Sequence, residues 1–394
     1  MHLRAWRVVA GTVAATLLLS VAAQAQSTGQ TRQLAHHIVV DVDNAKPGDV
    51  VLITTTVQNM TLVEDLMIEL RKAGAWPITF IQSDRANLAY YSEDPPSYDS
   101  QPPANSLRLA TIITSQINID EEQDPRLFQN VSPARQSAQN KAGLPITAYF
   151  AKHDIPFIEV GNGLFPSKYT AAQYGISKTQ LTWIFWNGVN EDYATVHANA
   201  QALHTALAAA SVVHVTAPNG TDITFGVKAR PIIVSDGSVK SSTRRNGTVP
   251  FIALPAGDVI VDPVPGSAKG TVVFDPVFFN NTEVDGMTMK FASGNMTSMT
   301  AKSGLAAVKA FYAAGTAGKD AFTFADFGVN PGVTYVPGSK MNVTMAAGMV
   351  SLGTGGDVFA GGSDTSTFNF ASYITGATVT LDGKTVVAKG KLVR

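Results

Sequence analysis

The sequence predicts an α/β protein with a Rossmann-like N-terminal domain and a β-rich C-terminal domain. Within residues 50–81, an apolar β-branched segment, an amphipathic helical segment and a second apolar segment follow one another, which is typical of a βαβ unit. After residue 211, short runs of alternating hydrophobicity replace most of the helical periodicity. The 394 residues exceed the usual size of one domain, and a hydrophobic content of 45% allows a sizeable core.

The first residues resemble a secretory signal peptide. Arg4 and Arg7 precede an apolar stretch over residues 8–21, and Ala23-Gln24-Ala25 has the small-residue pattern of a cleavage site. The apolar stretch is shorter than the roughly 20 residues that span a bilayer. We therefore expect residues 1–25 to be removed, and we expect the mature protein to be periplasmic or secreted, with no membrane association after cleavage.

The predicted N-terminal domain covers residues 26–211 and opens with the βαβ unit. Leu62, Leu66 and Leu70 share one helical face, and Gly74 marks the end of that helix. In chain order, we expect an extended segment at 39–42, a turn at 46–49, a strand at 50–55, a helix at 62–73, a strand at 78–81, an exposed loop at 95–103, a strand at 111–113, a helix at 132–141, a strand at 155–160 and a helix at 190–210.

The predicted C-terminal domain covers residues 212–394 and consists mainly of short strands. Asn219-Gly220 and Asp382-Gly383 are typical two-residue hairpin turns. A helix is expected at 304–314 and a flexible glycine-rich loop at 353–367. The strands are expected at 212–216, 223–227, 257–261, 270–274, 333–336, 378–381 and 385–388.

The composition excludes several kinds of site. Cysteine is absent, which excludes disulfides, cysteine nucleophiles and cysteine-bound metal. Six of the seven histidines precede residue 212 and none follows His214, so neither an imidazole-bound metal site nor a Ser-His-Asp triad can be built from the residues after His214 alone. With 29 Lys+Arg against 30 Asp+Glu and no basic cluster, we expect no nucleic-acid partner.

Four C-terminal stretches resemble motifs of the metal-dependent aminopeptidase family of the aminopeptidase T and aminopeptidase S type. LPAGDV at 254–259 resembles the family's P-x-G-E-V element, and ADFGVNPG at 325–332 resembles a shortened E-x-G-x-G-x-N-P-G. GMVSL at 348–352 resembles G-T-x-H-x, and GGSDTSTFNFA at 361–371 resembles G-G-x-N-x-S-x-x-H-x-D. The resemblance covers nearly the whole mature chain and implies a fold of the metallo-aminopeptidase type and a homodimer.

The family's five metal-ligand positions differ in this chain. Two glutamates, two histidines and an aspartate hold two metal ions in the family; the matching positions read Asp258, Asp326, Ser351, Asn369 and Ala371. Two carboxylates, a hydroxyl, an amide and a methyl group are poor donors for two transition metals. We therefore expect no bound cofactor, with weak Mg²⁺ or Ca²⁺ binding as an alternative. Two zinc, cobalt or manganese ions are expected only if the interpretation of these positions as a degenerate metal site is wrong.

Each carboxylate also has a purely structural interpretation. Without the resemblance, Asp258 and Asp326 would be read as turn or capping residues. Asp357, Asp364 and Glu283 are candidate replacement ligands if they converge on this pair; otherwise they are solvated loop residues. His197 and His204 share one helical face and are read as surface or interface residues.

Two functional hypotheses follow. The first is an exported metallo-aminopeptidase, or a relative with oxygen ligands, whose peptidase activity is in doubt because of its ligand positions. The second is a non-catalytic binding or structural protein that retains the peptidase cleft for a short peptide or a small molecule. The iron dioxygenases of dihydroxypyridine are similar in fold, but they rely on histidine and aspartate ligands in their C-terminal half, and no histidine follows His214 in this chain.

Overall fold

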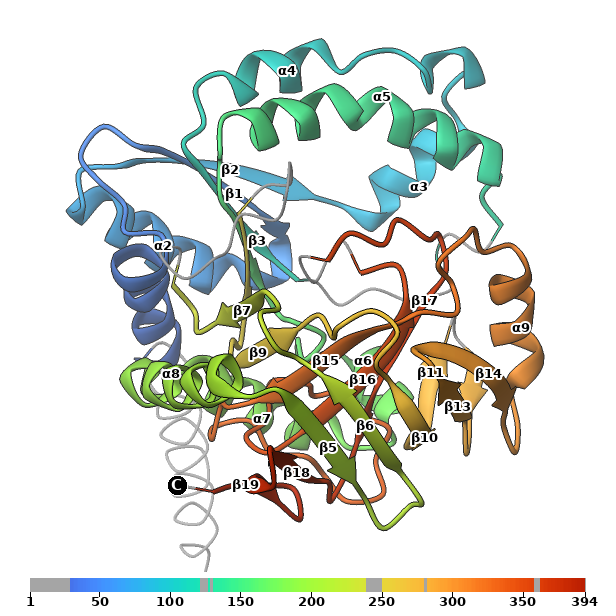
Figure 1. Ribbon diagram of the computed structural model, residues 1–394. Coiled ribbons are helices and arrows are strands. Elements are labelled where there is room, and N and C mark those ends of the chain that lie inside the picture. Colours follow the sequence, from blue (N-terminus) through green and yellow to red (C-terminus); the bar gives the residue numbers. More distant parts are fainter. Residues whose placement is uncertain are drawn as a thin grey trace, which may run out of the picture.

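The computed structural model describes residues 29–120, 127, 130–238, 250–279, 282–357 and 362–393. Its described residues form two lobes, one around a parallel sheet and one around two antiparallel sheets (Figure 1). The predicted signal peptide, residues 1–25, lies outside the described residues. No helix among the described residues is both long and apolar enough to cross a membrane.

The first lobe contains a five-stranded sheet in which every pair of neighbours is parallel. Its strand order is β2 (Trp76–Gln82), β1 (Val50–Thr56), β3 (Ser115–Ile119), β4 (Phe157–Val160) and β8 (Phe251–Leu254). The surrounding helices are η1 (His37–Val42), η2 (Val57–Asn59), α2 (Met60–Lys72), α3 (Asp84–Ser92), η3 (Pro96–Tyr98), α4 (Ala104–Ala110), α5 (Pro133–Lys152), α6 (Lys168–Tyr174) and α7 (Lys178–Val189).

The predicted βαβ unit is confirmed as β1, α2 and β2. The helix buries Leu62, Leu66 and Leu70, the residues that set its periodicity. It ends where Gly74, at φ +81°, adopts a backbone conformation that disfavours other residues. The expected later elements are also present as β4, α5 and α8 (Tyr193–Ala209), with shifted boundaries.

Two expected strands of this lobe are wrong. Residues 39–42 belong to the helix η1, because Ile38, Val39 and Val42 pack as one helical face against the core. Residues 111–113 form a turn before β3, and Ile113 instead packs beside Phe150 in a small satellite cluster. In both places, β-branched residues favour a strand locally, and tertiary packing overrides that preference.

The second lobe encloses its core between two antiparallel sheets. The larger has the order β14 (Asn295–Thr300), β13 (Thr288–Ala292), β10 (Lys269–Val273), β6 (Asp222–Gly226), β5 (Val212–Thr216), β18 (Thr378–Leu381), β19 (Lys384–Ala388) and β20 (Lys391–Leu392). The smaller has the order β17 (Asn369–Ile374), β16 (Val350–Gly355), β15 (Phe322–Gly328), β9 (Asp258–Val261) and β7 (Ile232–Ser235). A separate hairpin joins β11 (Val277–Phe279) and β12 (Thr282–Val284). Helix α8 packs its buried face, which includes Val196 and Leu203, into this core.

Most expected elements of the second lobe are confirmed, including both hairpins and the helix α9 (Leu305–Ala313). Residues 333–336 are not a strand, and Val333 packs into the core of the first lobe. The expected flexible loop at 353–367 is wrong at its start, because residues 353–355 complete β16. A Cβ at Gly353 would lie 2.8 Å from the Cβ of Ala371, so glycine here permits close strand packing.

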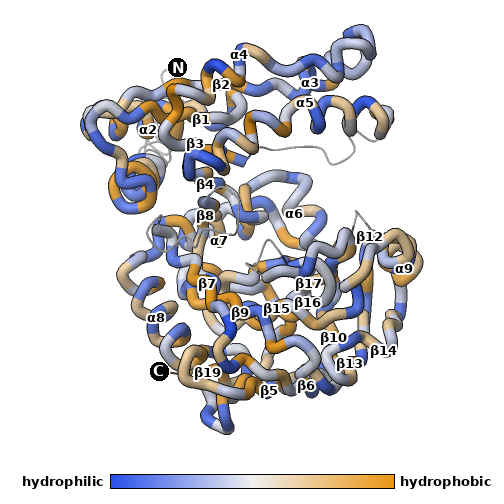
Figure 2. The backbone as a smooth tube through the Cα atoms, turned by 45° about the horizontal axis from the view of Figure 1, so that its top comes forward, coloured by the Kyte–Doolittle hydropathy of each residue, from blue (hydrophilic) through white to orange (hydrophobic). Residues whose placement is uncertain are grey.

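The predicted domain boundary at residue 211 stays a prediction, but the strand β8 joins the sheet of the other predicted domain. This strand comes from the C-terminal half of the sequence and completes the parallel sheet beside β4. Figure 2 shows β4 and β8 between the two lobes. Three residues after β8, the chain enters β9, so the junction leads directly from one sheet to the other.

Candidate functional site

The smaller antiparallel sheet brings three of the predicted site residues together. Asp326 on β15 lies directly opposite Ser351 on β16 and opposite Ile260 on β9. Asp258 lies opposite Gly328, two positions along β15, so the two aspartates are diagonal neighbours on one face. Their neighbours Val259, Ala325 and Phe327 point to the opposite face and belong to the core of the lobe. Strand alternation therefore directs both carboxylates away from that core.

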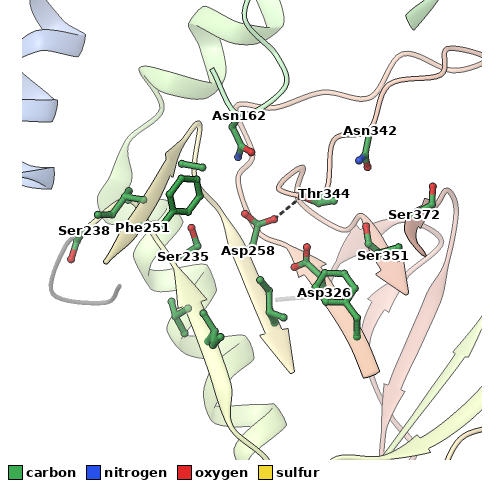
Figure 3. A pocket seen from close by; sticks show the side chains of 18 residues that line it. Asn162, Ser235, Ser238, Phe251, Asp258, Asp326, Asn342, Thr344, Ser351 and Ser372 are labelled. Atoms are coloured by element: carbon green, nitrogen blue, oxygen red, sulfur yellow. Dashed lines mark hydrogen bonds between the residues drawn. The ribbon is translucent and has the colours of Figure 1, made fainter. Parts of the chain in front are cut away.

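These side chains line a cavity of about 310 Å³ between the two lobes. Figure 3 shows the carboxylates of Asp258 and Asp326 pointing into it from neighbouring strands. Its lining has a polar part and an apolar part, called here the polar wall and the apolar wall, and Ile260 and Phe324 of the apolar wall lie on the same sheet face as the two aspartates. The polar wall adds Asn162, Ser235, Ser238, Asn342, Thr344, Ser351 and Ser372, and the apolar wall includes Ile233, Phe251, Ile252, Ile260 and Phe324.

The fully buried Asn330 holds the segment that carries Asp258. Its amide nitrogen donates to the carbonyl oxygens of Ala256 at 2.6 Å and Gly188 at 3.2 Å, and its amide oxygen accepts from the backbone N–H of Gly332 at 2.9 Å. Gly257 has φ +141°, and a Cβ there would lie 2.5 Å from the Cβ of Asn330. Two of the stretches that resemble family motifs therefore pack against each other and fix the start of β9.

The electrostatics of the pair are dominated by burial. Asp326 is 3% exposed; burial, the charge of Asp258 and a hydrogen bond with it raise the pKa of Asp326 well above its usual range. Asp258 accepts a hydrogen bond from the hydroxyl of Thr344 at 3.0 Å. Two buried carboxylates repel each other when both are ionised, so this pair favours a positively charged or hydrogen-bond-donating group beside it.

Three buried polar atoms of this cavity have no hydrogen-bond partner among the described residues. They are Oδ1 of Asp326, the hydroxyl oxygen of Ser351 and the hydroxyl oxygen of Ser372. A buried polar group without a partner costs roughly 1–3 kcal/mol. Such groups gathered in one cavity are typical of a place where a ligand or water supplies the missing partners.

The other two predicted positions contribute less. Ala371 lines the cavity but offers only a methyl group. Asn369 is exposed at the start of β17 and does not line the cavity. Four of the five positions that the resemblance indicates as metal ligands therefore line one cavity, and three of these four carry a polar side chain.

The candidate replacement ligands do not converge on the pair. Asp357 accepts from the backbone N–H of Asp364 at 2.7 Å, and Asp364 accepts from the N–H of Ser366 at 2.8 Å, so both organise their own loop. Glu283 pairs with the ammonium group of Lys340 at 2.6 Å. The structure assigns these three carboxylates to local contacts.

The donor set does not fit the binuclear metal centre that the resemblance implies. Among the described residues, no three His, Asp or Glu side chains gather closely enough to hold one metal ion. No histidine is among the described residues that line the cavity, and the Nδ1 atom of His197 lies 2.5 Å from Asp236. Zinc, cobalt and manganese sites need about three protein ligands each, mostly imidazole or carboxylate. Two carboxylates do not meet that need for two ions.

The sequence analysis missed several residues of the cavity. Asn342, Thr344 and Ser372 carry no motif signal, because a long irregular segment before β16 brings the first two beside Asp258. The apolar wall formed by Ile233, Ile260 and Phe324 comes from three separate strands. Strand alternation around Asp258 and Asp326 indicates Ile260 and Phe324 as residues of the same face, but Ile233 requires the position of β7.

Comparison with known proteins gives one family and several similar folds. The model of the thermophilic metalloprotease family (M29) matches residues 28–318. The wild-type AmpT structure from Thermus thermophilus is 15% identical, with a TM-score of 0.68 over 93% of this chain and 99% of that chain. A 2,5-dihydroxypyridine dioxygenase from Pseudomonas putida is 13% identical, with a TM-score of 0.56 over 93% of this chain and 97% of that chain. No curated protein sequence shows significant similarity.

Proposed function

Since the chain belongs to the thermophilic metalloprotease (M29) family, we propose that it is an exported, aminopeptidase-like protein whose cavity binds the amino end of a short peptide, or a similar small amine, without two-metal hydrolysis. The observation that supports this most directly is the group of buried, unpartnered oxygen atoms on Asp326, Ser351 and Ser372. They lie beside a second carboxylate, at the positions that the resemblance assigns to the family's metal ligands.

The chemistry of the two walls favours an amine with an apolar side chain. A protonated amine donates three hydrogen bonds and accepts none, which suits carboxylate and hydroxyl oxygens. Its positive charge offsets the repulsion between Asp258 and Asp326. The adjoining apolar side chains of Ile233, Ile260 and Phe324, on the same sheet, exclude water from a neighbouring hydrocarbon group.

Binding is tested by calorimetry with leucinamide as the probe. We expect leucinamide to bind and N-acetyl-leucinamide, which lacks the charged amine, to bind at least roughly tenfold more weakly. Asp326→Asn should reduce the affinity for leucinamide, whereas Glu283→Gln, which alters a distant ion-paired carboxylate, should not. Equal binding of both compounds, or no binding of either, contradicts the proposal.

A metal-dependent aminopeptidase is the second candidate, and the similarity in fold to AmpT favours it. Elemental analysis of protein dialysed without chelator separates the two candidates. We expect fewer than two equivalents of zinc, cobalt and manganese combined, and no chelator-sensitive release of the N-terminal residue from aminoacyl substrates. Two equivalents that disappear together with activity in Asp326→Ala would establish the enzyme instead.

Export and assembly complete the proposal. The signal-like residues 1–25 support a periplasmic or secreted protein with a mature start near Gln26, which intact-mass measurement on protein from the native host checks. The family resemblance suggests a homodimer, and the exposed side chains of Trp76 and Phe80 on the edge strand β2 provide an apolar surface for it. Light scattering that gives the mass of one mature chain contradicts the dimer.

A further inference from the structure

The parallel sheet of the first lobe has a topological switch point between β1 and β3. From β1 the chain moves to β2 on one side, and β3 then pairs with the other side of β1. In open parallel sheets, the crevice beyond the carboxyl ends of the strands at such a point is the usual place for a ligand. The side chain of Asn59, just beyond β1, donates to the hydroxyl of Thr55 and to the backbone carbonyl of Asp120. These two bonds join the carboxyl ends of β1 and β3.

A polar cavity of about 360 Å³ lies at this edge. It is formed where three strands end: Gln82 ends β2, Asn118 and Asp120 lie at the end of β3, and Gly163 follows β4. Phe165 and Thr170 complete its outer side. This cavity is separate from the one that holds Asp258 and Asp326, and no described residue lines both.

The backbone beside the cavity is shaped around Asp120. Gly161 has φ +155°, and a Cβ at this position would lie 1.9 Å from the carboxylate of Asp120, so only glycine leaves room for that side chain. The next turn is fixed by the hydroxyl of Tyr174, which donates to the carbonyl of Gly163 at 2.8 Å. The backbone conformation of Gly161 therefore leaves space for the Asp120 carboxylate at the carboxyl end of β3.

We propose that this second cavity binds a small polyhydroxylated molecule through the side-chain amides of Gln82 and Asn118 and the carboxylate of Asp120. Neither amide makes a hydrogen bond with another described residue, and each offers both a donor and an acceptor. Hydroxyl groups are matched to that set, because each one also donates and accepts. The ring of Phe165 supplies an apolar surface for the C–H face of a sugar ring.

The charges at the cavity narrow the ligand class further. No lysine or arginine is among the described residues that line it, and Asp120 contributes a carboxylate, so a phosphate or another anion is disfavoured. A free sugar or polyol and the ribose of a nucleoside present the same vicinal hydroxyls. An uncharged ligand of either kind can therefore form hydrogen bonds with the three polar side chains of the cavity. This inference does not depend on the function proposed for the first cavity.

Ligand-observed NMR and calorimetry on the mature protein test the proposal. The probes are glucose, ribose and myo-inositol as free polyols, and uridine and adenosine as nucleosides, each up to about 10 mM, a concentration that detects interactions of roughly 3 kcal/mol. We expect at least one probe to bind, and the two groups of probes show whether the base adds affinity.

Matched variants locate the binding. Asn118→Leu keeps the size of the side chain and should weaken binding at least roughly tenfold, because the hydroxyls lose their partner. Gln82→Met changes a residue at the end of an edge strand, so its effect on binding can be measured even if Asn118→Leu fails to fold. Ser351→Ala alters the other cavity and should leave binding unchanged. No binding of any probe, equal binding by folded Gln82→Met or Asn118→Leu, or loss in Ser351→Ala overturns the proposal.

Discussion

Replacing Asp43 with asparagine should remove a large pH-dependent cost to the stability of the first lobe. The side chain lies just after η1 and accepts a hydrogen bond from the hydroxyl of Ser115 at 2.9 Å, which ties the N-terminal helix to the start of β3. Burial raises the pKa of Asp43 from 3.8 to about 6, against the opposing effect of that hydrogen bond. The folded protein therefore holds a proton that the unfolded chain releases.

The magnitude follows from the size of this shift. A pKa raised by about two units corresponds to about 3 kcal/mol, because one unit is worth 1.36 kcal/mol. A raised pKa in the folded state means that the contribution to stability is present below pH 3.8 and is lost as the pH rises through about 6. Between pH 4 and pH 7.5, the wild type should thus lose about 2 kcal/mol relative to Asp43→Asn, whose side chain stays neutral.

Urea unfolding at several pH values measures this difference. Trp76, Trp183 and Trp186 all lie in the first lobe, so tryptophan fluorescence reports the part of the protein that contains Asp43. Comparing the two proteins at each pH cancels the titration of all other groups. Ser115→Ala should move the transition to higher pH, because it removes the hydroxyl that stabilises the charged form. A stability difference between wild type and Asp43→Asn that is the same at pH 4 and pH 7.5 would refute this reasoning.

Three further substitutions test the first cavity and its support. Gly257→Ala should destabilise the protein by roughly 3 kcal/mol or more, because the added Cβ would lie 2.5 Å from the Cβ of Asn330. The control Gly383→Ala has open space around it and φ +86°, so it should cost only the roughly 1–2 kcal/mol of an unfavourable backbone conformation. Urea unfolding compares the two variants, and equal losses of stability would count against the close contact. Asn330→Leu leaves the carbonyls of Ala256 and Gly188 without their donor and should cost roughly 2–5 kcal/mol; a change below about 1 kcal/mol would show that these bonds matter little. Phe324→Ala should weaken the binding of leucinamide by roughly tenfold and that of glycinamide much less, because only the leucine side chain of the ligand contacts the apolar wall. Calorimetry measures both affinities, and an equal effect on the two ligands would show that the leucine side chain binds elsewhere.

Local patterns predicted the fold where local preference and tertiary packing agree. The leucines of α2 and the Asn219-Gly220 turn each specify an element by themselves, and both elements are present. The same kind of pattern failed at residues 39–42, where β-branched residues lie on a buried helical face. It also failed at Gly353, where glycine permits close contact between strands rather than a loop. In those places, a neighbour distant in sequence decides the conformation.

The candidate site was predictable only in part for a similar reason. The stretches that resemble family motifs indicated Asp258, Asp326 and Ser351, and strand pairing brings these residues together. Thr344 and Ser372 reach the cavity through the path of the chain around β16 and β17, which no spacing in the sequence reveals. The role of Asn330 as a buried support also depends on the carbonyl of Gly188, which is 142 residues away.

The short passage from β8 to β9 gives the first cavity a mechanical property. Leu254 ends a strand of the parallel sheet, and Asp258 begins a strand of the antiparallel sheet, with only residues 255–257 between them. Asp258 and Asp326 belong to neighbouring strands of the antiparallel sheet, so strand pairing sets their spacing, whereas Phe251 and Ile252 reach the same cavity from β8 of the parallel sheet. A rotation of one sheet against the other would therefore change the distance between the two carboxylates and the β8 side of the cavity, and residues 255–257 are the only backbone between β8 and β9 that would transmit it.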